Sequence, residues 1–276
     1  MTIRIEQESY RIPDSWNSLS GDQYAVLCSL IGTYKDPQAI RVNFLFYLLG
    51  LKVDPFNPSD KGCFLHHRGK LIFLDSETIA EMCQGLDFLF TQDSGQRVLN
   101  PDLCTNHFKK ITAHRKKLIG PEDKLVNVRL GEFIHADSLY HQYISTWDPS
   151  ALNKFLACLW REKDPQITED SPLYKGDLRI AFNPYTLESQ GGTVSFLSEQ
   201  VKMGCFLFYA GSRNYISRRF PNLFSSYSSS YSPDAYMSLC YDLCNSDVSK
   251  INQILDSYVY DVFMFLENSI KNKNKS

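Results

Sequence analysis

The sequence of 276 residues lacks the short motifs that mark the commonest catalytic and nucleotide-binding sites. It has no GxGxxG turn, no GxxxxGK[ST] phosphate loop, no HExxH zinc helix, no GxSxG nucleophile elbow and no DxDxDG calcium loop. We therefore expect no cofactor and assign no catalytic residue. An enzyme of unrecognised class stays an alternative, because triad members can lie far apart in a sequence. Cys63 and Cys205, each preceded by glycine, are the cysteines in the most suitable context for a nucleophile.

The chain also lacks an excess of charge and a long hydrophobic run. Its 29 Lys and Arg against 31 Asp and Glu give a formal charge of −2, so no chain-wide field attracts nucleic acid or an anionic membrane. The most apolar runs, 42–51 and 203–210, are shorter than the ~20 residues that span a bilayer. The amino terminus alternates apolar and charged residues, unlike a secretory signal. These features predict a cytoplasmic protein without a membrane partner.

Cysteine spacing gives no sign of a disulfide scaffold or a metal centre. The eight cysteines are scattered through predicted helices and strands, which is typical of reduced, buried thiols. Two local groupings could contribute metal ligands, Cys63 with His66 and His67, and Cys240 with Cys244. A structural zinc site needs four converging ligands, so we expect no metal.

Helical patterns dominate the chain and predict a mainly α (α+β) fold of helical hairpins and a bundle. Ser20 and Gln23 fit a capping box, and Asp148 with Pro149 fits the start of a helix that forms a hairpin with the helix before it. A small β element is expected at 2–12, and Arg68-Gly69 predicts a β-hairpin near 63–74.

Three regions follow from this pattern. Residues 1–90 hold the β element and the first helices, 91–130 are an irregular connection, and 131–276 are a helical domain with a Ser-rich loop at 225–232. Near the carboxyl terminus, a stripe of apolar residues predicts one helix over 247–270, N-capped by Ser246.

The chain has an unusually high content of aromatic residues. Phe, Tyr and Trp together make 13% of the chain, and Tyr and Trp suit protein contact surfaces because they combine apolar area with a polar tip. Tyr227 and Tyr231 lie in the Ser-rich loop, where no core function is evident, and are candidate partner-binding residues. Trp16 is a third candidate, with packing against the first helix as its alternative.

A basic segment at 107–117 carries five cations without an acidic residue: Lys109, Lys110, Arg115, Lys116 and Lys117. Such a segment could contact phosphates, which makes a nucleic-acid-associated protein an alternative function. A solvated basic face is the simpler interpretation, because Phe108 is the one aromatic residue within it. Nucleic acid is therefore not among the expected partners.

Several apolar segments resemble uncharacterised proteins of prophage structural modules, of the tail-assembly or tail-chaperone type. They are 13–24 (PDSWNSLSGDQY), 44–50 (FLFYLLG), 131–137 (GEFIHAD) with Tyr140 and Tyr143, 152–161, 206–209 (FLFY) with Arg213, 220–224 (FPNLF) and 247–267. The resemblance implies a non-catalytic assembly or interaction protein that binds other phage structural or assembly proteins. It also implies a place in the cytoplasm of a bacterial host, or in the phage particle itself.

Overall fold

The computed structural model describes residues 2–5, 7–172, 174–225, 241, 243–244 and 247–273. Helices account for 53% and strands for 18% of it, and the strands form several small antiparallel sheets. The predicted mainly helical α+β class is therefore confirmed. Two compact units make up the chain: unit 1 comprises Met1–Leu103 and Glu199–Leu207, and unit 2 comprises Cys104–Ser198 and Phe208–Ser276.

The division between the units falls inside the segment 91–130, which is more regular than its sequence indicates. It contains β7 (Gln96–Leu99), β8 (Lys110–Ala113), β9 (Lys116–Ile119) and the 3-10 helix η3 (Asp123–Leu125), and β6 (Phe90–Asp93) begins at its edge. These strands have four residues each, and most side chains of β6 and β7 face solvent. Apolar alternation therefore cannot reveal them.

The first helices of unit 1 begin where capping residues predict. The side chains of Ser20 and Gln23 form a reciprocal capping box at α1 (Gly21–Thr33), and Asp36 caps α2 (Pro37–Leu48). Beyond α2, Gly50 adopts a left-handed φ of +65°, as expected of a glycine that ends a helix. The 3-10 helix η1 (Trp16–Ser18) precedes α1, whereas α3 (Ser76–Cys83) and the 3-10 helix η2 (Gln84–Leu89) come after α2.

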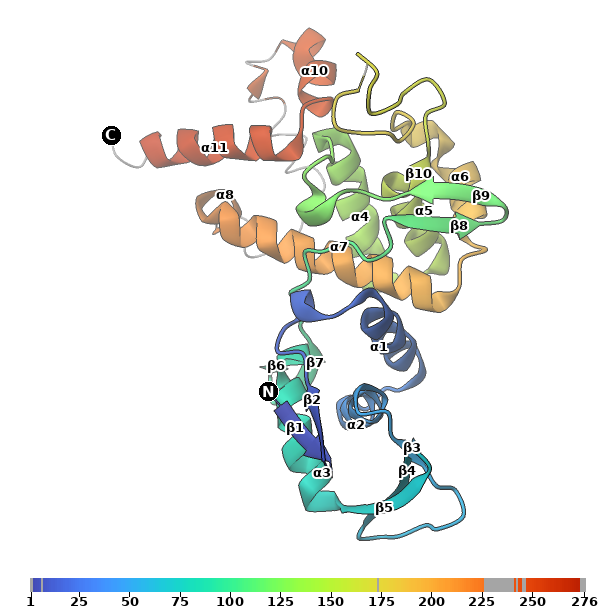
Figure 1. Cartoon of the computed structure of the whole chain (residues 1–276). Coiled ribbons are helices and arrows are strands. Elements are labelled where there is room, and N and C mark those ends of the chain that lie inside the picture. Colours follow the sequence, from blue (N-terminus) through green and yellow to red (C-terminus); the bar gives the residue numbers. More distant parts are fainter. Residues whose placement is uncertain are drawn as a thin grey trace. The chain divides into compact units, whose positions relative to one another are not determined.

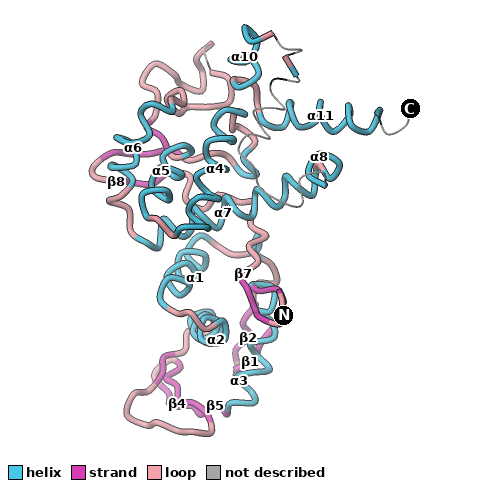
Figure 2. Tube along the Cα trace, turned by 180° about the vertical axis from the view of Figure 1, so that it is seen from behind, coloured by secondary structure: helices cyan, strands magenta, loops and turns pink. Residues whose placement is uncertain are grey.

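The strands of unit 1 form three small sheets. The strands β1 (Thr2–Ile5) and β2 (Glu8–Arg11) form the expected amino-terminal β element, and β6 pairs with β7. The third sheet has the order β3 (Lys52–Val53), β4 (Gly62–His67) and β5 (Lys70–Asp75), so the predicted hairpin at 63–74 is confirmed. Figures 1 and 2 show these strands as short hairpins attached to helices.

Unit 2 is built around a helical hairpin with an aromatic core. It contains α4 (Leu130–Thr146), α5 (Pro149–Leu159), η4 (Pro184–Thr186), α6 (Leu187–Val194), α8 (Pro221–Ser225), η5 (Val248–Lys250), α10 (Ile251–Leu255) and α11 (Val259–Lys273). The helix α7 (Glu199–Arg219) gives its first nine residues to unit 1 and the rest to unit 2. Trp147, with a φ of +55°, ends α4 before Asp148 caps α5, as the sequence predicts. Phe155 and Tyr209 contact each other within the core.

One small sheet of unit 2 joins β8, β9 and the short strand β10 (Arg161–Glu162) in the order β10–β9–β8. No described helix combines the length and the apolar character that crossing a membrane requires.

The predicted continuous helix over 247–270 is wrong. The chain turns between α10 and α11, where the Leu130 N–H donates to the Ser257 carbonyl and the Val259 N–H donates to the Val128 carbonyl. Pairing with the segment before α4 satisfies these backbone groups outside a helix, so tertiary contacts override the apolar periodicity. The proposed N-cap, Ser246, lies outside the described residues.

Candidate functional site

One face of the β3–β4–β5 sheet in unit 1 carries large apolar side chains that remain exposed. The register pairs Phe64 with Phe73 and His66 with Leu71, and directly opposed residues of antiparallel strands lie on the same face. We call Phe64, Leu71 and Phe73 the apolar sheet face, and the polar His66 lies beside them. The rings of Phe64 and Phe73 contact each other with centroids 4.9 Å apart. Leu71 and Phe73 are nevertheless 48% and 43% exposed.

The opposite face of the same sheet belongs to the core of unit 1. Leu65 is fully buried, and His67 is almost so. The Nε2 atom of His67 lies 2.7 Å from the hydroxyl oxygen of Tyr10, which links this strand to β2. The register is thereby fixed, because a slip of one residue would exchange the two faces.

Gly62 permits the close approach of β5 to β4. A Cβ atom at this position would lie 2.2 Å from the carbonyl oxygen of Leu74 and 2.8 Å from Cζ of Phe73. The ring of Phe73 therefore occupies space that a side chain at position 62 would need.

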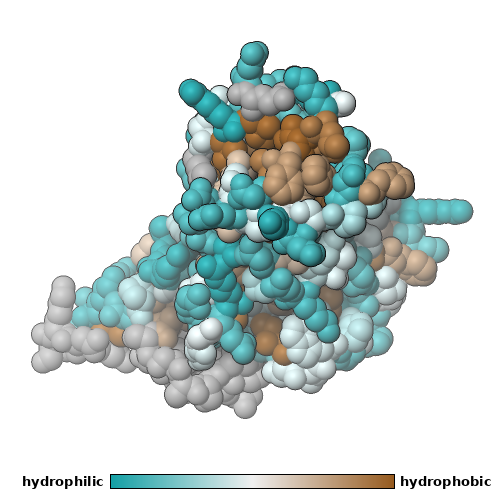
Figure 3. All heavy atoms as spheres, turned by 90° about the horizontal axis from the view of Figure 1, so that it is seen from below, coloured by the Kyte–Doolittle hydropathy of each residue, from teal (hydrophilic) through white to brown (hydrophobic). Residues whose placement is uncertain are grey.

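The strand β5 lies at an edge of the sheet. It pairs with β4 on one side, and no strand of the described ranges pairs with its other side. An edge strand offers backbone donors and acceptors to a further strand. Figure 3, turned so that the molecule is seen from below, shows apolar side chains gathered in one area of the surface.

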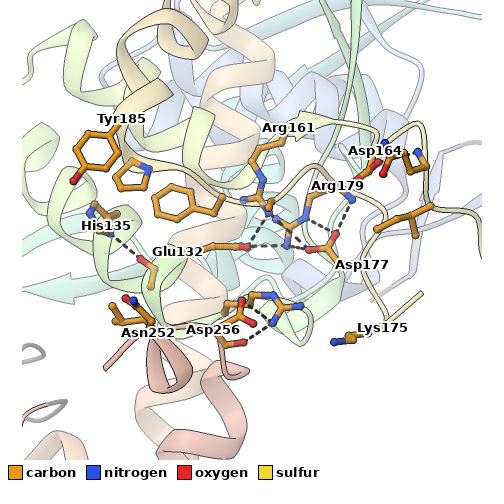
Figure 4. Close-up of a pocket in the computed structure, with 18 residues that line it drawn as sticks. Glu132, His135, Arg161, Asp164, Lys175, Asp177, Arg179, Tyr185, Asn252 and Asp256 are labelled. Carbon is orange, nitrogen blue, oxygen red and sulfur yellow. Dashed lines mark hydrogen bonds and ion pairs between the residues drawn. The ribbon is translucent and has the colours of Figure 1, made fainter. Parts of the chain in front are cut away.

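A pocket of about 740 Å³ lies in unit 2, between the start of α4, α10 and the irregular segment 164–185. Its inner wall is a network of buried charges (Figure 4). Arg161 Nη2 lies 2.8 Å from Glu132 Oε1, and Arg179 Nη2 lies 3.2 Å from Glu132 Oε2 and 2.7 Å from Asp177 Oδ2. Two guanidinium groups thus face two carboxylates, and the charges of the network cancel.

Backbone carbonyls complete the hydrogen bonds of both arginines. Arg161 donates to the carbonyl of Ile180 at 2.8 Å and to that of Cys158, and Arg179 donates to the carbonyl of Leu159 at 2.8 Å. Burial lowers the pKa of Arg161, and the negative charge of Glu132 offsets part of this decrease. Burial also opposes the charge of Arg179, but Glu132 and Asp177 outweigh it and raise the pKa of that side chain. The network fastens the irregular segment to α4 and α5.

The mouth of the pocket is polar and partly aromatic. The Nδ1 atom of His135 lies 2.9 Å from the carbonyl oxygen of Gly131, which accepts a hydrogen bond from it, and the ring of His135 lies against Phe182. Tyr185 is 95% exposed at the rim. Figure 4 shows Lys175 apart from the network, and no described carboxylate forms an ion pair with it. Such groups can hydrogen-bond a polar ligand, while the buried charges are occupied with one another.

The basic segment forms the β8–β9 hairpin of unit 2, and the structure separates its cations into two kinds. Lys109 Nζ lies 2.7 Å from Glu122 Oε2, and Lys116 Nζ lies 2.7 Å from Glu162 Oε1. The remaining three, Lys110, Arg115 and Lys117, are exposed and have no ion-pair partner among the described residues.

Of the three aromatic candidates, Trp16 alone belongs to the described residues. Trp16 is buried, with 2% of its surface exposed, which agrees with the packing alternative, and its indole is not available to a partner in this structure. Tyr227 and Tyr231 lie outside the described residues. The apolar sheet face was not identified from the sequence. The sequence does contain a signal for this face, which is the run of four consecutive apolar residues at 71–74. Because side chains alternate along a strand, such a run places apolar residues on both faces of the hairpin, and only one face can be buried.

Cysteines and histidines do not gather into a ligand set within the described part of the chain. No group of three or more His, Cys, Asp or Glu side chains there could hold a metal ion. Burial raises the pKa of the Cys28 thiol to about 12, and it also raises the pKa values of Cys158 and Cys205. Cys28, Cys158 and Cys205 are free thiols.

Comparison of the chain with models of known protein families, with curated proteins and with solved structures finds no match.

Proposed function

We propose that this protein is a non-catalytic assembly or interaction factor of phage tail morphogenesis, a chaperone or a minor structural component. The observation that supports this proposal best is the apolar sheet face on an edge-strand sheet. The resemblance of the apolar segments to prophage tail-assembly proteins supplies the biological setting. The partners are then other phage structural or assembly proteins in the cytoplasm of a bacterial host.

An exposed apolar face of this kind favours binding to another protein. Fully burying a Leu or Phe side chain is worth about 1.5–3 kcal/mol. Leu71 and Phe73 are each about half exposed, so covering both stabilises a complex by a similar amount in total. The free edge of β5 can add backbone hydrogen bonds to that apolar contact.

The buried network of the pocket supports a structural role for its charged groups. Glu132 accepts from both Arg161 and Arg179, and both arginines also donate to backbone carbonyls. Buried charges engaged in this way fix the conformation of the segments that carry them.

The test is affinity purification of the tagged full chain from cells in which the phage genes are induced. We expect tail proteins in stoichiometric amounts with the wild-type chain and a strong loss with the double variant Leu71→Ser/Phe73→Ser. Trp147→Ser is the matched control, because Trp147 is 69% exposed but lies in unit 2. Equal recovery with the double variant, or no tail protein with the wild type, would overturn the proposal.

A further inference from the structure

Three hairpins of this chain turn through two residues with left-handed backbone, and one of them lacks the usual glycine. The pairs are Arg68-Gly69 between β4 and β5, Ser94-Gly95 between β6 and β7, and His114-Arg115 between β8 and β9. The second residue has φ values of +82° at Gly69, +82° at Gly95 and +66° at Arg115. The second turn residue thus has a left-handed backbone in all three hairpins, and it is glycine in two of them and arginine in the third.

An arginine in the left-handed region is strained, whereas glycine is not. Arg115 is exposed, and no described carboxylate forms an ion pair with it. Neither packing nor a salt bridge therefore compensates for the strain within the described residues. A residue with a strained backbone at an exposed turn, where it does not stabilise the fold, indicates that its side chain is needed for binding.

The cations beside Arg115 lie on the outer side of the hairpin. In the register of β8 and β9, Lys117 lies opposite Thr112, and Lys110 is two residues before Thr112 on the same face. The other face carries Ile111 and Leu118, which are buried. Lys110, Arg115 and Lys117 thus form a solvent-facing set, and all three lack an ion-pair partner within the described part of the chain.

An aromatic pair adjoins the tip of the hairpin. The rings of His114 and Phe196 are stacked, with centroids 4.4 Å apart and an interplanar angle of 26°. Phe196 is 64% exposed despite this contact. An exposed ring beside unpaired cations is the combination that binds a base and its flanking phosphates.

We infer that the tip and the outer side of the β8–β9 hairpin together bind single-stranded nucleic acid. Arg115, Lys110 and Lys117 contact phosphates, and a base stacks on Phe196. A single strand fits better than a duplex, because only unpaired bases present a free face for stacking. An anionic membrane surface would also bind the cations, but it offers no base to stack on the Phe196 ring.

The experiment measures the fluorescence anisotropy of a labelled 20-nucleotide oligo-dT with the full chain, over a range of salt concentrations. Three phosphate contacts predict a slope of about −2 in the plot of log affinity against log salt concentration. Arg115→Gly should raise the midpoint of thermal unfolding by about 2–4 °C while reducing the slope by about 0.7. Phe196→Ala should weaken binding about 5- to 150-fold.

Lys109 and Lys110 provide a matched pair of neighbours. Lys110→Gln should weaken oligonucleotide binding, and Lys109→Gln should not, because Lys109 is already paired with Glu122 and Asp123. The inference is overturned by no binding at low salt, or by unchanged affinity and slope for Arg115→Gly. Equally tight binding of a duplex, or of anionic phospholipid vesicles, overturns it in favour of general phosphate attraction. The apolar sheet face lies in unit 1, so its variants serve as controls that should bind the oligonucleotide normally.

Discussion

Arg161 Nη2 lies 2.8 Å from Glu132 Oε1, and both side chains are at most 2% exposed. Glu132 belongs to the first turn of α4, and Arg161 begins β10, just after Trp160 caps the end of α5. Their ion pair joins the end of one helix to the start of the other across 29 residues of sequence. Arg179 adds the irregular segment to the same carboxylate.

Removing the shared carboxylate should therefore destabilise the protein strongly. Glu132→Gln leaves Arg161 and Arg179 buried without their common partner, which should lower the free energy of unfolding by about 3–5 kcal/mol. Urea titration followed by circular dichroism measures the change. Glu162→Gln, which removes the exposed partner of Lys116, should cost no more than about 1 kcal/mol. A loss below 1 kcal/mol for Glu132→Gln would show that the network does not fasten unit 2.

Gly62→Ala should destabilise unit 1 and displace Phe73. The added Cβ meets backbone atoms of β5 at 2.2 and 2.7 Å, so the strands must separate. We expect a loss of about 1–3 kcal/mol in urea titration, together with weaker recovery of tail proteins. Gly32→Ala in α1 is the control, because a Cβ there meets nothing within 4 Å. It should be neutral or stabilising by up to about 1 kcal/mol, and equal behaviour of the two variants would contradict the packing described.

Glu267 should make stability depend on pH. Its carboxylate accepts from the Asn222 side chain at 2.6 Å and from the Leu223 N–H at 3.0 Å, at the start of α8. Burial alone would raise the pKa of Glu267, but these hydrogen bonds outweigh burial and lower it below its usual value. The stabilisation is then fully present above the unfolded-state pKa of about 4.3 and is lost as the pH falls through the lower folded-state value.

The variant Glu267→Gln tests this pH dependence. It should be less stable than the wild type at pH 7, and the difference should shrink as the pH falls below about 4. Urea midpoints at several pH values measure it, with Glu199→Gln as a control at an 82% exposed side chain. A difference that stays constant with pH would argue against a role for the ionised carboxylate.

Three buried cysteines should resist alkylation in the native protein. The pKa of Cys28 is raised to about 12 and those of Cys158 and Cys205 are also raised by burial, so almost no thiolate forms at pH 8. Iodoacetamide treatment followed by peptide mass spectrometry should find these sites unmodified until denaturant is added. Cys63, which is partly exposed, should react first among the four. Rapid native modification of Cys158 would contradict its burial.

Local signals in the sequence predict much of the fold. The capping pair of Ser20 and Gln23, the Arg68-Gly69 turn and the Asp148-Pro149 start all act within a few residues, and the structure places helices and a hairpin there. The β8–β9 hairpin was not predicted, because its turn holds His114 and Arg115 where a glycine would mark it. The break between α10 and α11 depends on pairing with residues 128–130, which no local pattern reveals.

The candidate surfaces depend on long-range structure to a greater degree. From the sequence alone, Leu71 and Phe73 would be assigned to the core. The strand register shows that they lie on the face of the hairpin opposite to the buried one. Lys109 and Lys116 differ from the unpaired cations because they form ion pairs with Glu122 and Glu162. Glu162 lies 46 residues from Lys116 in the sequence, so this ion pair cannot be predicted locally. Composition indicates that such surfaces exist, but only the fold determines which residues compose them.

Hydrogen–deuterium exchange on the purified complex tests the central proposal most directly. The tagged chain is compared alone and bound to the tail protein it recovers, and exchange is followed for peptides that cover the whole chain. The account predicts slower exchange over residues 62–75 in the complex, greatest at the free edge of β5. Unchanged exchange over 62–75, with protection confined to other segments, would contradict it.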